Sequence, residues 1–187
     1  METDANLTMI RIYALAKERE LGEKLFAYPI TGNSNDIVPM PSGTGCLLYP
    51  NDSIYKFLGA KPLRDMSVMS YLNALQKKRL ASDNVKDYIL CGYLIDKKLD
   101  AFAHTLPIFY AIDDKLPRYY KEALILYRHL RANPFVVYHN DVMDTDYNDL
   151  QELEKRHNTQ KVRKDAVYAQ YHDTYWWYYE YGGNKQE

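Results

Sequence analysis

Cysteine, long apolar runs and an excess of charge of either sign are all scarce in this sequence of 187 residues. Cys46 and Cys91 belong to no C-x-x-C or Cys/His spacing, which argues against a zinc site or a dithiol redox site. We expect two free thiols, with Cys91 buried as a small core residue. The net charge of −1 argues against a protein that binds nucleic acid by neutralising phosphates.

Membrane-spanning and targeting segments are missing as well. The longest strongly apolar stretch, residues 88–95, has 8 residues, whereas a spanning helix needs about 20. The first 25 residues are charged throughout and contain no apolar block of the kind found in signal peptides. Taken with Met1 as its natural start, the chain reads as a cytoplasmic protein without a membrane span.

Motifs for catalysis and cofactor binding are absent too. The five histidines form no H-x-x-x-H pair, a spacing found in zinc hydrolases. The Gly-Thr-Gly run at 43–45 lacks the lysine of a phosphate-binding loop. The run D-x-D-x-N at 144–148 opens like a calcium loop, but it has Asp149 and Lys155 where that loop needs Gly and Glu. We interpret its carboxylates as the N-cap and first turn of a helix, and predict no catalytic residue, cofactor or metal.

Helical spacing of apolar residues is abundant and predicts an all-α fold. The inner faces expected for two of the helices are the stripes Leu7, Ile10, Ala14 and Leu21, and Met66, Met69, Leu72 and Leu75. The expected helices cover residues 7–25, 51–58, 64–79, 82–95, 99–106, 117–131, 146–157 and 160–171.

Proline and glycine mark the boundaries of these helices. Pro107 is expected to break or kink one helix, and Pro117 to occupy the first position of another. Residues 29–50 hold four of the eight prolines and three of the eight glycines, which excludes a regular element there. So long an irregular segment must be packed by its own apolar residues, be functional, or be mobile.

The order of these helices predicts the architecture. Successive antiparallel pairs joined by short turns describe helical hairpins that resemble degenerate tetratricopeptide repeats, although the strict 34-residue pattern is not met. We expect a single helical domain over residues 1–187. Its charge is uneven, with 13 basic and 8 acidic residues between 61 and 131 and 6 basic and 10 acidic residues after them. This contrast indicates either complementary packing within one domain or a face for an acidic partner.

Tyrosine is the compositional outlier, with 19 residues. Residues 168–181 include 8 aromatic side chains among 14. Such a segment is interpreted as a cap that docks on the last helices, as a surface for a partner, or as a belt at a membrane interface. For the partner surface, the candidate residues are Tyr175, Trp176, Trp177 and Tyr178, together with Tyr138 and His139.

Several segments carry a resemblance to a known family. They are LGEKLFAYP at 21–29, DYILC at 87–91, LDAF at 99–102, LPRYYKEALILY at 116–127 and DTYWWYY at 173–179. The chain resembles the soluble C-terminal part of an uncharacterised family of multi-pass membrane proteins from Bacteroidetes, whose helical domain is similar to tetratricopeptide repeats. This resemblance implies a domain tethered to a membrane in a longer protein, on the periplasmic side, and it implies no activity.

Two functions follow from these patterns. The first is a helical protein-interaction or assembly module without catalysis, whose protein partner is unknown. The alternative is an enzyme of unknown reaction with a site between the 29–50 loop and the segment Tyr138–Asp146, because irregular segments often carry function. A deep polar pocket would favour the enzyme, and a shallow groove would favour the module.

Overall fold

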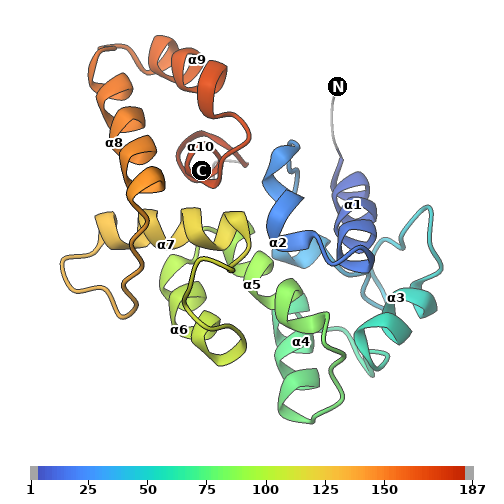
Figure 1. The fold of residues 1–187 in the computed structure, drawn as a ribbon. Coiled ribbons are helices and arrows are strands. Elements are labelled where there is room, and N and C mark those ends of the chain that lie inside the picture. The colour runs from blue at the N-terminus through green and yellow to red at the C-terminus, as the bar shows by residue number, and fades with distance from the viewer. Residues whose placement is uncertain (1–3, 184–187) are drawn as a thin grey trace.

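The computed structural model describes residues 4–183, which form ten α-helices and two 3-10 helices and include no strand (Figure 1). The prediction of an all-α protein built from helical hairpins is therefore confirmed. The elements in chain order are α1 (Ala5–Lys17), α2 (Leu21–Lys24), η1 (Leu25–Ala27), η2 (Ser34–Asp36), α3 (Asn51–Leu58), α4 (Val68–Lys77), α5 (Val85–Ile95), α6 (Leu99–Phe109), α7 (Arg118–Leu130), α8 (Asp141–Lys155), α9 (Gln160–Tyr171) and α10 (Tyr175–Tyr181).

Short polar side chains begin several of these helices. The side-chain oxygens of Asp4, Ser67, Asn140 and Thr174 accept hydrogen bonds from amides of the first turns of α1, α4, α8 and α10. Each bond satisfies an amide that has no partner within its helix. The N-cap of α8 is thus Asn140, and the helix starts five residues before the expected 146. The D-x-D-x-N run lies inside α8 rather than at its cap.

Left-handed residues end three helices where no glycine is available. Arg19, Arg79 and Lys97 have φ of 61°, 56° and 58° and follow α1, α4 and α5. After α1, the amide of Arg19 donates to Ala16 and the amide of Glu20 donates to Leu15, the paired bonds of a Schellman turn. This turn separates α1 from α2, so the single helix predicted over 7–25 is wrong.

The buried faces of α1 and α4 also differ from the expected stripes. The residues of α1 that are buried are Thr8, Met9, Ile12, Tyr13, Leu15 and Ala16. Those of α4 are Val68, Tyr71, Leu72 and Leu75. Leu21, Leu72 and Leu75 of the expected stripes are buried, whereas Leu7, Ile10 and Ala14 are only partly buried, because several apolar faces were compatible with a 3.6-residue period. In the structure the buried face of α4 packs against α5, and that of α1 packs against α2 and the two 3-10 helices.

Two helices form the centre of the molecule. Helix α5 is buried nearly all round, as predicted, and α7 buries eight residues. Consecutive helices from α4 to α10 pack against one another, and α10 folds back beneath α9 to contact α7 (Figure 1). Pro107 does not end α6, which continues to Phe109. Pro117 occupies the N-cap position of α7, one residue before the first helical position that was expected for it.

The 29–50 segment is packed against the helices. Ile37 and Val38 are each 1% exposed. Ser34 donates from its amide and its hydroxyl to Asp96 at the end of α5, over 2.9 and 2.7 Å. Asn6 of α1 donates to the carbonyl of Gly45 over 2.9 Å. Of the three roles considered for this segment, packing by its own apolar residues accounts for its conformation.

Candidate functional site

An open groove of about 490 Å³ lies between α4 and the linker of residues 60–66; we call it the α4 groove. Two leucines in it are unusually open to solvent, since Leu63 is 92% exposed and Leu80 is 50% exposed. The apolar side chains that line it are Ala60, Pro62, Leu63, Met66, Tyr71, Ala74, Leu75 and Leu80. Exposed apolar side chains gathered in a concave site are typical of binding surfaces.

Local contacts hold the walls of the α4 groove in place. The hydroxyl of Tyr71 donates to the carbonyl of Ala60 over 2.5 Å and fastens the linker to α4. The amide of Ser82 donates to Leu58 over 2.9 Å and brings the end of α4 against the end of α3. Gly59 has φ of 128°, and a Cβ there would lie 1.9 Å from the carbonyl oxygen of Leu80. Only glycine permits this approach, so Gly59 allows the segment after α4 to pack against the end of α3.

Positive charge surrounds the apolar floor of the α4 groove. Residues 61–80 contain five basic residues and one acidic residue. Lys61 lies 3.3 Å from Asp52, whereas Arg64 and Lys78 form no ion pair within residues 4–183. An apolar floor with unpaired cations at its rim favours a ligand that presents apolar and anionic groups together.

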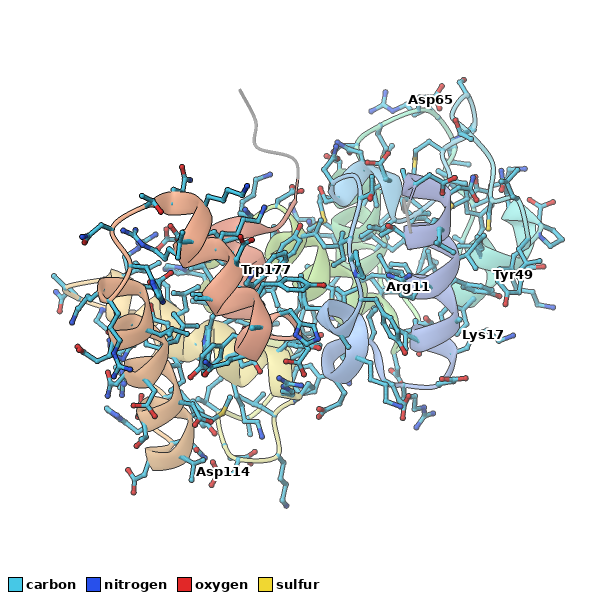
Figure 2. All side chains as sticks on the ribbon, turned by 90° about the horizontal axis from the view of Figure 1, so that it is seen from above. Arg11, Lys17, Tyr49, Asp65, Asp114 and Trp177 are labelled. Atoms are coloured by element: carbon cyan, nitrogen blue, oxygen red, sulfur yellow. The ribbon has the colours of Figure 1, made fainter. Side chains whose placement is uncertain are left out.

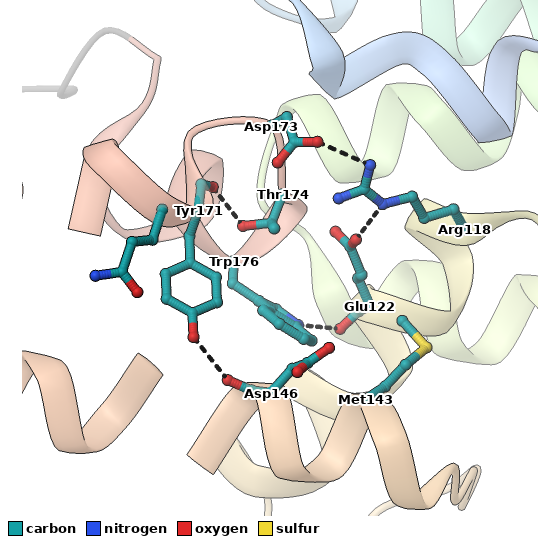
Figure 3. Close-up of a pocket in the computed structure, with 9 residues that line it drawn as sticks. Arg118, Glu122, Met143, Asp146, Tyr171, Asp173, Thr174 and Trp176 are labelled. Carbon is teal, nitrogen blue, oxygen red and sulfur yellow. Dashed lines mark hydrogen bonds and ion pairs between the residues drawn. The ribbon is translucent and has the colours of Figure 1, made fainter. Parts of the chain in front are cut away.

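A second cavity, of about 400 Å³, lies between α7, α8 and the turn before α10 (Figure 3). At its wall Glu122, which is 2% exposed, accepts hydrogen bonds from Arg118 over 2.7 Å and from the amide of Tyr175 over 2.6 Å. Arg118 also pairs with Asp173 over 3.0 Å. The indole of Trp176 donates to the carbonyl of Glu122 over 2.8 Å.

These interactions fasten α10 to α7. Burial raises the pKa of Glu122 to about 7, against the opposing effects of the Arg118 guanidinium and the Tyr175 amide. Both carboxylate oxygens of Glu122 have protein donors, and Arg118 is shared between two carboxylates. The cluster therefore accounts for the docking of the aromatic helix α10 on α7. By itself it does not indicate a reaction.

Three of the six candidate partner-binding residues belong to α10 and are part of the core. Tyr175, Trp176 and Tyr178 are 0%, 5% and 5% exposed. The hydroxyls of Tyr175 and Tyr178 donate to the carbonyls of Leu94 and Ile95, over 3.1 and 2.9 Å. A partner has no access to these three side chains, which corrects their assignment to a binding surface. Their contacts fit the alternative interpretation of the tail as a docked cap.

The other three candidates lie in two separate places. Trp177 is half-buried and lines a shallow pocket of about 190 Å³ with Tyr28 and Tyr168. Tyr138 is 5% exposed and donates to Asp114 over 2.8 Å. His139, two residues before the start of α8, is exposed and contacts Arg128 of α7. Of the six, only Trp177 and His139 offer surface to a ligand.

The location suggested for an alternative enzyme site combines the 29–50 segment with Tyr138–Asp146. Asp114, which binds Tyr138, and Tyr49 of the 29–50 segment lie far apart (Figure 2). These parts of the two segments are therefore not neighbours. Within residues 4–183 no group of His, Cys, Asp and Glu side chains is arranged to hold a metal ion.

The α4 groove was not predicted, although the sequence contains a pattern that indicates it. Leu63 and Leu80 interrupt a strongly basic region at positions outside the helical stripe. Apolar residues next to unpaired lysines and arginines are the composition expected of such a rim. The pattern did not reveal that residues 60–66 fold along α4 and leave a concave space.

The fold and the groove together define an all-helical protein with an open surface between α4 and the linker that precedes it. Within the described residues no helix has the length and apolar character needed to cross a membrane. The chain belongs to the family of unknown function DUF6057, whose pattern matches residues 50–182 and so includes the α4 groove and the aromatic tail. No curated protein and no solved structure matches the chain.

Proposed function

We propose that this protein is a helical interaction module whose α4 groove binds an acidic amphipathic segment of a partner protein. The observation that carries the proposal is the combination of Leu63, 92% exposed, with the unpaired cations Arg64 and Lys78 around one groove. Burying a leucine stabilises a complex by about 1.5–3 kcal/mol. The cations attract acidic segments and reject basic ones.

The concave shape supports a peptide ligand over a flat surface. A helix that lays its apolar face into a groove inserts side chains spaced by three or four residues. The linker of residues 60–66 and the face of α4 that carries Tyr71, Ala74 and Leu75 form the two walls that such a helix needs. Acidic residues beside the inserted side chains would then meet Arg64 and Lys78 at the rim.

A binding assay with a synthetic peptide tests this proposal. A labelled helix-forming peptide with leucine on one face and glutamate on the other is titrated with the protein, and its fluorescence anisotropy is measured. We expect saturable binding that weakens as salt increases. A peptide with lysine in place of glutamate serves as the charge control and is expected not to bind.

Variants locate the binding site. Leu63→Ala is expected to weaken peptide binding about tenfold, which corresponds to about 1.4 kcal/mol. Leu47→Ala, at a leucine that is 81% exposed outside the groove, is the matched control and should bind as tightly as the wild type. Equal binding of both peptides, or equal effects of the two variants, would overturn the proposal. So would binding of anionic lipid vesicles in place of the acidic peptide.

The resemblance to membrane-attached Bacteroidetes proteins extends this proposal to the location of the complex. We propose that the native protein presents this tetratricopeptide-like domain beside a membrane, where its partner meets the α4 groove. The support is the resemblance alone, which covers most of residues 7–181. Fractionation of the full-length native protein tests it, because a tethered protein resists extraction by alkaline carbonate whereas a peripheral one is released.

A further inference from the structure

The outer face of α8 has the chemistry that the α4 groove favours. Val142 is 70% exposed, and Asp149 lies seven residues after it on the same face of the helix. Asp146, four residues after Val142, is exposed at the edge of this face, beside the cavity between α7, α8 and α10. Asp141 is exposed beside Val142. One apolar side chain is thus surrounded by carboxylates on a rigid, solvent-exposed helix.

The charges of this face are available for a partner. Residues 132–154 include six acidic residues and no lysine or arginine. Asp144 is paired with Arg128, and Glu152 is paired with Lys155. Within the described part of the chain, the carboxylates of Asp141, Asp146 and Asp149 form no ion pair. They complement the unpaired cations of the α4 groove in sign.

The same molecule cannot bring these two surfaces together. The inner face of α8, which includes Tyr147 and Leu150, is packed against α7 and α9. Helices α4 and α8 lie at different ends of the molecule (Figure 1). The acidic face of α8 is therefore free for the groove of another molecule.

We propose that the α4 groove of one molecule binds the outer face of α8 of a second copy of this chain. The inference rests on the proposed function, because it names the acidic amphipathic segment. Val142 enters the groove beside Leu63 and Leu80, and Asp146 and Asp149 meet Arg64 and Lys78. The two contacting surfaces differ, so each added copy leaves one groove and one α8 free, and the assembly grows head to tail.

Sedimentation equilibrium over a range of protein concentrations tests this assembly. One helix face in one groove is a small interface, and we expect a Kd on the order of 100 μM. The average mass should rise with concentration beyond that of a dimer and fall as salt increases. A mass that stays at one chain across the range, or that stops at a closed dimer, overturns the inference.

A charge exchange tests which residues make the contact. Lys78→Glu and Asp149→Lys, each alone, should reduce association at least tenfold, because each places like charges together. The variant that carries both substitutions should recover association, since position 78 of one copy and position 149 of the next again bear opposite charges. Lys17→Glu, at the end of α1 outside the groove, is the matched control for a charge reversal at a helix C-terminus and should associate like the wild type.

The outcomes separate this inference from the proposed function. If the wild-type protein stays monomeric but binds the acidic peptide through Leu63, the self-assembly is wrong and the interaction module stands. If neither occurs, both are wrong. Association that survives Lys78→Glu and Leu63→Ala places the contact elsewhere and overturns the inference. Circular dichroism of every variant verifies that its helices are intact.

Discussion

Ending the chain after His172 would test whether the aromatic tail is part of the core. The deletion removes the buried side chains of Tyr175, Trp176 and Tyr178. It also removes the amide that donates to Glu122, and it uncovers the ends of α5 and α7 on which α10 packs. We expect the shortened chain to be much less stable than the complete one.

The expected loss of stability follows from the apolar area that the aromatic side chains of α10 bury. Three aromatic side chains that each bury on the order of 200 Å² contribute about 15 kcal/mol at about 25 cal/mol per Å². Ordering the seven residues of α10 costs about 1.5 kcal/mol per residue, or about 10 kcal/mol. The net contribution of α10 is therefore about 5 kcal/mol, a large part of the roughly 5–15 kcal/mol that stabilises a whole domain.

Thermal unfolding followed by far-ultraviolet circular dichroism measures this effect. For a chain of this size each kcal/mol corresponds to about 2–4 °C, so we expect the midpoint to fall by more than about 10 °C or the cooperative transition to disappear. A chain ending at Gly183, which retains α10, is the control. If the midpoint of the shorter chain lay within about 5 °C of the control, the reasoning from burial would be refuted.

Three further predictions concern single residues. Because the folded-state pKa of Glu122 is raised to about 7 from 4.5, its contribution to stability is present below pH 4.5 and is lost as the pH rises to 7. The free energy of unfolding of Glu122→Gln, measured by urea titration at each pH, should lack this decline. A pH profile parallel to that of the wild type would contradict the prediction. Arg19→Gly, at a φ of 61°, should stabilise the protein by about 0.5–1 kcal/mol, whereas Glu18→Gly, at a right-handed position, should destabilise it; equal shifts in melting temperature would exclude the turn. Cys46 should react with a thiol reagent much faster than Cys91, because burial raises the pKa of the Cys91 thiol, and equal rates would refute this.

Several features could be predicted from the sequence because they depend on short stretches of chain. The central helix around Cys91 was recognisable because its residues are apolar on every side. Helix α7 was recognisable because Pro117 precedes a regular apolar stripe and basic residues follow it. The end of α1 could not be recognised from the sequence, because the turn at Arg19 uses a residue type with no left-handed preference.

By itself the sequence determined the helical class of this protein and the burial of its central helix. Each of these follows from composition and spacing within a few turns of chain. Only the tertiary structure decided which apolar residues remain outside. Leu75 is 5% exposed and Leu63 is 92% exposed, although both are leucines in the same basic region, because the contact between Gly59 and Leu80 shapes the linker around the end of α4. Whether an exposed residue lies in a groove depends on how distant segments of the chain pack together, and no local sequence pattern predicts that packing.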